Sequence, residues 1–119
     1  MRNELLKFKV SYGIVRVTVY LLNSVHDVHM EYYSGSRCRN GQKVNAFFMG
    51  TVSESSKRTG SIVLARNSLL EECVPHEVAH AVLHKLVEVS RMDDEYMAKA
   101  IGILTSRITR MLRKYGYIA

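Results

Sequence analysis

The spacing of apolar residues divides the chain into a strand-rich first half and a helical second half. Residues 14–22 are rich in β-branched and aromatic side chains, which is typical of a strand. Shorter apolar runs predict further strands at 28–33, 44–52 and 61–65. A weaker pattern predicts a short N-terminal helix over 3–9. Polar residues predict loops at 34–41, with a turn at Asn40-Gly41, and at 53–60.

Beyond Asn67 the apolar period changes from two residues to 3.6, the period of an amphipathic helix. The pattern predicts one helix over 76–89 and a second from about 94 to 114, which ends at Gly116. The two halves together predict an α+β fold.

The sequence is compatible with two starting positions for the first of these helices. Ser68 and Glu71 have the spacing of a capping box, which favours a start near Ser68. Pro75 would then kink a long helix. Alternatively, Pro75 occupies the first turn of a helix that begins near Val74, where its missing N–H costs little.

Composition narrows the class of protein. A chain of 119 residues that is 47% hydrophobic predicts one globular domain over 1–119 and excludes a wholly disordered chain. No apolar run approaches the roughly 20 residues that span a bilayer, and the N-terminus lacks the apolar region of a secretory signal. The two cysteines, Cys38 and Cys73, cannot form a disulfide framework. We therefore expect a cytoplasmic protein without membrane partners.

The charge balance gives only weak information about partners. Lys and Arg total 17 and Asp and Glu total 11, so the formal net charge is +6. The predicted C-terminal helix carries a basic set that would suit nucleic acid, although a solvated helix face is the favoured interpretation. That set is Arg107, Arg110, Arg113 and Lys114.

The candidate metal-binding and catalytic residues lie in the helix predicted over 76–89. His76, Glu77 and His80 form an H-E-x-x-H motif. Residues four apart on a helix are separated by about 40° of rotation and about 6 Å of rise, so two imidazoles can bind one zinc ion. Glu77 is then placed to act on a zinc-bound water as a general base. The motif predicts one Zn²⁺ per chain.

A third protein ligand is expected, and the sequence offers several. His84 is eight residues from His76, too far along the helix to share one ion. His26 and His29 could approach from the strand-rich half. Asp94 and Glu95 are better candidates, and we favour Glu95. Small residues at Ala98 and Gly102 share its helical stripe and would permit close packing against the first helix.

Some secondary candidates accompany the motif. Cys73 lies one helical turn before His76 and is expected to be a small buried side chain. Three tyrosines could stabilise an oxyanion, although the sequence cannot place them: Tyr96, Tyr115 and Tyr117.

The segments 61–64, 74–81 and 94–98 together resemble the zincin metallopeptidases. More narrowly, they resemble small gluzincin-like metallopeptidases of phages and mobile elements. The resemblance covers about 61–105 and implies a three- or four-stranded sheet packed on the H-E-x-x-H helix and a C-terminal helix. It also implies that His76, His80 and Glu95 bind zinc and that Glu77 is the general base.

Two functions from different classes are compatible with these residues. The first is a zinc-dependent hydrolase of peptide bonds, with a peptide or protein substrate paired along an exposed edge strand, for which we consider 62–65. The second is a zinc-stabilised phage or mobile-element protein that recruits a host protein or DNA. Glu77 favours the hydrolase, because a purely structural zinc site has no need of it.

Overall fold

The structure is a computed structural model that describes residues 1–34, 44–51 and 58–119. It has the predicted α+β class. A four-stranded mixed sheet has the order β1-β2-β4-β3, in which β2 and β4 are parallel and the other neighbours are antiparallel. The elements in chain order are β1 Glu4–Tyr12, β2 Val15–Leu22, α1 Val25–Ser34, β3 Ala46–Gly50, β4 Gly60–Ala65, α2 Leu70–Glu88 and α3 Asp94–Lys114.

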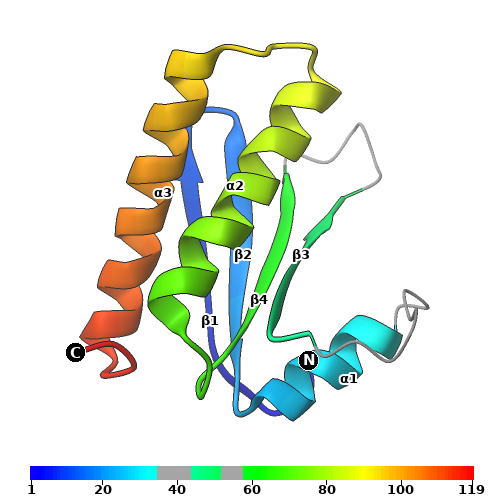
Figure 1. Cartoon of the computed structure of the whole chain (residues 1–119), viewed down its shortest axis with the longest axis vertical. Helices are drawn as coiled ribbons and strands as arrows, with labels where there is room; N and C mark the ends of the chain where they lie inside the picture. The colour runs from blue at the N-terminus through cyan, green and yellow to red at the C-terminus, as the bar shows by residue number, and fades with distance from the viewer. Residues whose placement is uncertain (35–43, 52–57) are drawn as a thin grey trace.

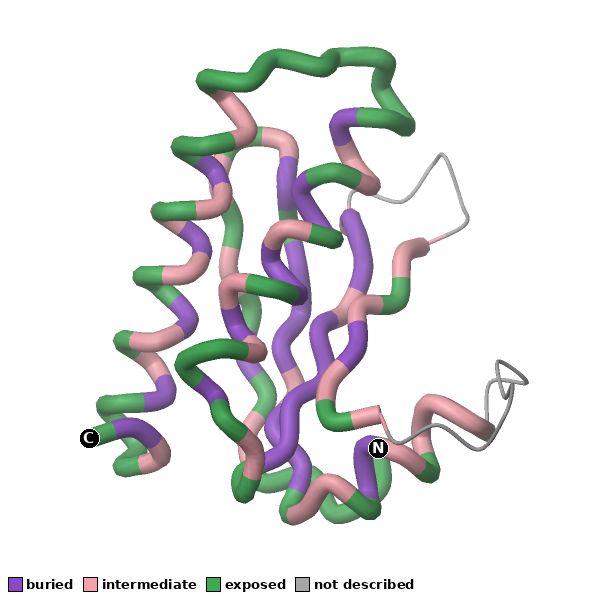
Figure 2. The backbone as a smooth tube through the Cα atoms, in the orientation of Figure 1, coloured by how far each residue is buried: buried purple, intermediate pink, exposed green. Residues whose placement is uncertain are grey.

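Helices α2 and α3 cover one face of the sheet, and α1 lies at one end of the molecule (Figure 1). The main core fills the space between that face and the two helices, where residues of β2 and β4 pack against residues of α2 and α3. The buried positions of these elements are purple in Figure 2. The fully buried members of the core include Val17, Val19, Ile62, Leu64, Val78, Val82, Leu104 and Ile108. This core fixes α2 against the sheet.

Among the described elements, α1 packs on the opposite face of the sheet, at one end. There α1 packs on a second, smaller cluster of buried residues: Leu22, Val28, Phe47, Val63 and Ala65. Farther from α1, the same face of β1 presents exposed Lys7 and Lys9. We refer below to this part of the sheet as the open face.

The first ten residues differ from the sequence prediction. Of the residues 3–9 predicted as a helix, residues 4–9 belong to strand β1 and Asn3 lies in the turn before it. Leu6, Phe8 and Val10 pack on the main core while the lysines between them point outward. This alternation is the period-two pattern of a half-buried strand.

Residues 28–33, predicted as a strand, belong to helix α1. The residues before them cap a helix. The hydroxyl of Ser24 accepts from the backbone N–H of Asp27 at 3.2 Å and donates to the carboxylate of Asp27 at 2.9 Å. Asn67, distant in sequence, accepts from the N–H of Val25. Two side chains therefore satisfy amides at the start of the helix, which a strand would not need.

Helix α2 is continuous from Leu70, with Pro75 inside it, so there is no restart near Val74. Because Pro75 has no N–H, the carbonyl of Glu71 lacks its helical hydrogen-bond donor. Glu71 is exposed, so water can reach that carbonyl. The predicted capping box does not form, because the hydroxyl of Ser68 donates to the carbonyl of Ala65 and Leu69 is the N-cap residue.

The remaining boundaries agree closely with the sequence. Helix α3 spans the predicted residues, and Asp93 caps it by accepting from two backbone N–H groups. Gly116 follows it with a φ of +83°, a conformation suited to glycine. The predicted strand over 44–52 is β3, although Val52 lies outside the described residues, as do Cys38 and the Asn40-Gly41 turn. Within the described chain, no helix is both long and apolar enough to cross a membrane.

Candidate metal centre

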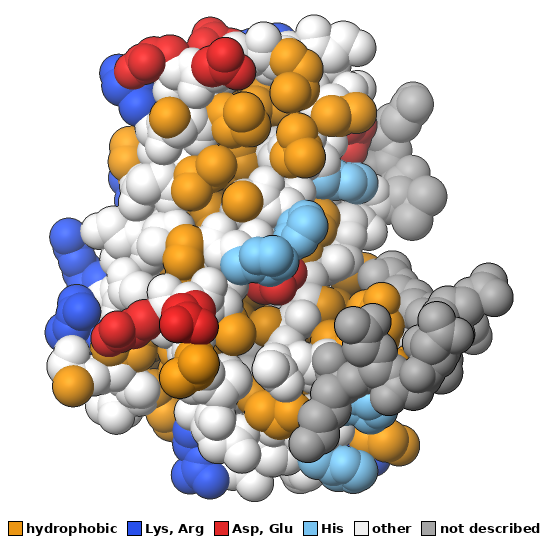
Figure 3. All heavy atoms as spheres, viewed as in Figure 1, with side chains coloured by type: hydrophobic (Ala, Val, Ile, Leu, Met, Phe, Trp, Pro, Cys, Tyr) orange, Lys and Arg blue, Asp and Glu red, His pale blue; other side chains and the backbone are white. Residues whose placement is uncertain are grey.

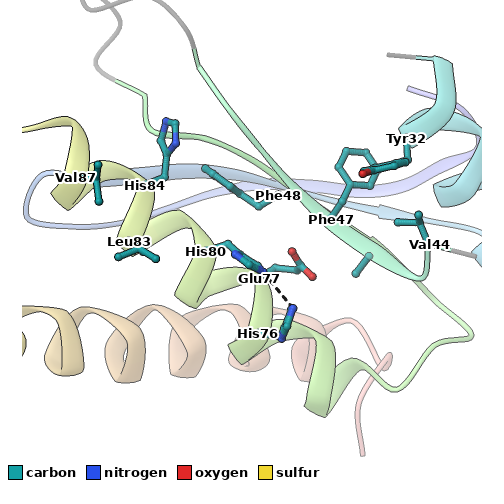
Figure 4. Close-up of a pocket in the computed structure, with 11 residues that line it drawn as sticks. Tyr32, Val44, Phe47, Phe48, His76, Glu77, His80, Leu83, His84 and Val87 are labelled. Atoms are coloured by element: carbon teal, nitrogen blue, oxygen red, sulfur yellow. Dashed lines mark hydrogen bonds between the residues drawn. The ribbon is translucent and has the colours of Figure 1, made fainter. Parts of the chain in front are cut away.

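The two histidines of the H-E-x-x-H motif project from the same side of α2. His76 and His80 are both exposed, and their Nε2 atoms are 3.2 Å apart. Their rings meet edge to face, with centroids 4.8 Å apart. Figure 4 shows the two imidazoles converging next to Glu77, and Figure 3 shows histidine side chains at the middle of this face of the molecule.

The spacing of these two nitrogen atoms fits a zinc ion. Two ligands at zinc–nitrogen distances of ~2.0–2.1 Å in a tetrahedral arrangement are about 3.3–3.4 Å apart. The observed separation of 3.2 Å is close to that value. Imidazole nitrogen is also a common protein ligand of zinc. The pair is therefore suited to hold one zinc ion with little rearrangement.

Glu77 lies beside the pair but is much less accessible. Only 7% of its surface is exposed, whereas both histidines are exposed. Burial raises the pKa of the Glu77 carboxyl above its ordinary value, and the neighbouring His76 and His80 act in the opposite direction. A carboxylate held at the floor of the site can contact a water molecule bound between the histidines without competing with them as a ligand.

These three residues line a groove of about 550 Å³ between α2 and the edge strand β3. One wall comes from α2 and the other from β3 and α1 (Figure 4). The wall residues other than the motif are largely apolar or aromatic: Tyr32, Val44, Ala46, Phe47, Phe48, Leu83, His84 and Val87. The β3 wall was not predicted from the sequence, in which the Phe47-Phe48 pair of a predicted strand was the available sign.

Glu95 does not join the two histidines in this structure. It is exposed in the first turn of α3, next to the end of α2, whereas His80 lies eight residues before that end, about 12 Å along the axis. Asp94 is likewise exposed. Among the described residues, no three His, Cys, Asp or Glu side chains are grouped so as to hold a metal ion.

The packing argument that favoured Glu95 is wrong. Ala98 and Gly102 are exposed, and a Cβ atom added to Gly102 would meet nothing within 4 Å. The face of α3 that packs against the rest of the protein carries Ala100, Leu104, Ile108 and Leu112 instead. Glu95 as third ligand stays a prediction from sequence that this arrangement does not support.

The other histidines divide between two places. His26 and His29 lie on α1 and line a separate depression with Met30 and Asn67. His84 lines the same groove as the motif, one helical turn beyond His80. Its ring packs on Phe48 and lies close to the backbone of Gly50, where an added Cβ atom would be 2.5 Å from it.

Cys73 and the three tyrosines that the sequence offered as secondary candidates are not part of the groove lining. Cys73 is partly buried against the main core, and burial raises the pKa of its thiol. The hydroxyl of Tyr96 accepts from the N–H of Ile14 at 3.1 Å, which ties α3 to the turn between β1 and β2. Tyr96, Tyr115 and Tyr117 are absent from the lining of the groove, to which Tyr32 contributes.

Comparison of the chain with protein-family models, curated proteins and solved structures found no match. The functional argument therefore depends on the geometry of the groove and its residues.

Proposed function

We propose that the protein is a zinc-dependent metallopeptidase whose active site is the groove between α2 and β3. The observation that carries the proposal is the 3.2 Å separation of the His76 and His80 Nε2 atoms beside the buried carboxylate of Glu77. A structural zinc site would require the two histidines but not a buried acid in the same groove.

In this proposal His76 and His80 hold the ion, which when bound supplies a Lewis acid and a water molecule of lowered pKa. Glu77 takes a proton from the attacking water as the new C–O bond forms at the scissile carbonyl carbon. It then delivers that proton to the amide nitrogen as the C–N bond breaks. The products are a carboxylic acid and an amine, so one water is consumed for each bond cleaved.

The substrate would lie along β3. Residues 62–65, predicted from the sequence as the edge strand, are not at the edge, because β4 pairs with β2 on one side and with β3 on the other. Strand β3 is the last in the sheet order and also forms a wall of the groove. An extended peptide can therefore add to β3 through main-chain hydrogen bonds while its scissile bond faces the histidines.

The walls of the groove favour apolar substrate side chains. Phe48 lies on the β3 side, and Leu83 and Val87 lie on the α2 side, with Val87 60% exposed. Exposed hydrophobic side chains continue beyond the histidines over this face of the molecule (Figure 3). Burial of a substrate side chain against them would contribute binding energy in proportion to the apolar area covered.

The test compares Glu77→Gln with Glu71→Gln, which makes the same chemical change at an exposed site on the same helix. Zinc content, melting temperature and hydrolysis of a peptide library enriched in apolar residues are measured. We expect both variants to retain zinc and Glu77→Gln to lose about 10²–10⁴-fold in hydrolysis. A zinc-loaded wild type that cleaves no peptide in the library would overturn the proposal and favour the zinc-stabilised binding protein.

A further inference from the structure

The open face of the sheet carries a set of cations that the groove does not use. Inward side chains of β1 and β2 pack on the main core, so the alternate positions point to the other face. On β1 these are Lys7, Lys9 and Ser11, and on β2 they are Arg16, Thr18 and Tyr20. The register places Lys7 opposite Tyr20, Lys9 opposite Thr18, and Ser11 opposite Arg16.

The three cations form a continuous positive stripe. Lys7, Lys9 and Arg16 are all exposed. From the row of Lys7 to the row of Arg16 the stripe extends about 13 Å, at 3.3–3.4 Å per residue. At its border, the Arg58 guanidinium donates at 3.0 Å to the hydroxyl of Thr18, which is buried.

Acidic side chains do not neutralise the stripe within the described residues. The acidic residue of β1 on this face is Glu4, which pairs with Leu22 at the end covered by α1. Its carboxylate lies 3.9 Å from the N-terminal ammonium of Met1. The ion pairs among described residues do not include Lys7, Lys9 or Arg16.

An aromatic ring lies among these cations. Tyr20 is half-buried at the border of the open face, where it packs against the smaller cluster beneath α1, and the Lys7 ammonium lies 5.4 Å from its ring centroid. Cations that track a phosphate backbone, combined with an aromatic ring on which a base can stack, are the features of surfaces that bind single strands. Duplex DNA keeps its bases stacked and offers no free base to Tyr20, and an acidic peptide offers none at all.

We propose that the open face binds single-stranded nucleic acid, with phosphates on Lys7, Lys9 and Arg16 and a base on Tyr20. The three cations would contact about three phosphates, each contributing about 0.7 to the salt dependence of binding. The basic C-terminal helix is the alternative surface, which the control variant below tests. On that helix, Arg107 donates to the carbonyl of Ser11, Arg113 donates to the carbonyl of Ala119, and Lys114 lies over the ring of Tyr115.

The experiment measures binding of a fluorescent 12-nucleotide single strand by anisotropy over a range of salt concentrations. The test variant is K7Q/K9Q/R16Q. The control, R110Q/R113Q/K114Q, removes the same charge from exposed positions of α3. We expect the test variant to lose at least tenfold in affinity at low salt. The magnitude of the slope of log K against log salt should fall by about 2, because each of the three lost phosphate contacts contributes about 0.7.

The control should bind within about threefold of wild type, and an equal loss in both variants would overturn the proposal by showing that net charge alone drives binding. Tyr20→Leu should weaken single-strand binding at least about fivefold, the lower range of one base stack. Tighter binding of duplex, or equal competition by polyglutamate, would also overturn it.

Four further variants keep the result interpretable. K7R/K9R retains the charges and should bind like wild type. If the triple variant fails to fold, Lys7→Gln and Lys9→Gln are tested singly, and each should reduce the slope by about 0.7. Glu77→Gln should leave oligonucleotide binding unchanged, because it lies in the groove, so this proposal and the peptidase proposal can fail independently.

Discussion

The two ends of the α2–α3 pair differ in how well the sequence predicts the arrangement of their candidate ligands. In the half of α2 that contains His76 and His80, a local spacing places two imidazoles at zinc-binding distance. At the other end, where α2 gives way to α3, Asp94 and Glu95 were expected to reach the same ion through tertiary packing. There the packing differs from the expectation, and the two acids remain exposed.

The difference arises from what determines each arrangement. The separation of residues i and i+4 on one helix is set by helix geometry and needs no other element. The position of Glu95 depends on which stripe of α3 faces the protein. That stripe is chosen by burial of Leu104 and Ile108, whose apolar surface outweighs the close approach that Ala98 and Gly102 would allow.

The largest expected effect is loss of zinc on replacement of either histidine. His76→Ala and His80→Ala should each abolish stoichiometric binding, because one remaining imidazole cannot form the pair that fits the ion. Zinc is measured per chain after dialysis against a metal buffer. His84→Ala, in the same groove, is the matched control and should retain about one zinc per chain. Full zinc in both test variants would contradict a metal centre at this end of α2.

The next effect tests which stripe of α3 is buried. Leu104→Ala should lower the free energy of unfolding by about 2–5 kcal/mol, because Leu104 is fully buried between α3 and the sheet. Denaturant unfolding with a common m-value measures it. Ile103→Ala, at a partly exposed neighbouring position, should cost clearly less. Equal losses at the two positions would contradict the orientation of α3 on which the comparison depends.

Much of the fold could be predicted from sequence where a local signal and the tertiary structure agree. Strand β2 and helix α3 have the predicted bounds to within a residue, because β-branched residues fill one and Asp93 and Gly116 delimit the other. The histidine pair follows in the same way from a spacing of four.

The errors came from segments whose state depends on distant partners. The short apolar run at 28–33 suits a strand as well as a helix, and the Asn67 side chain that helps to cap α1 is 42 residues from Val25. The groove also has a wall from β3, whose place at the sheet edge follows from the strand order. The order of the strands in the sheet is not encoded in any local pattern of the sequence.

A smaller effect concerns the exposed stripe of α3. Gly102→Ala should raise the free energy of unfolding by about 0.5–1 kcal/mol, because alanine favours a helix and nothing lies within 4 Å of the added Cβ atom. The melting temperature and denaturant midpoint report it. Destabilisation by Gly102→Ala would instead indicate that this stripe packs closely against another helix, as the sequence argument supposed.

The smallest expected effect is that of Glu95→Ala on zinc affinity. Glu95 is exposed, lies far along the helix pair from His80, and does not line the groove. We therefore expect the zinc dissociation constant to stay within about twofold of wild type, with Asp94→Ala as the neighbouring control. A ligand would behave differently, since even the loss of a residue that only supports a ligand weakens metal binding by ~10–100-fold. A loss of that size in Glu95→Ala alone would mean that the first turn of α3 moves to the histidines when zinc binds, and the two ends of the helix pair would then form one site.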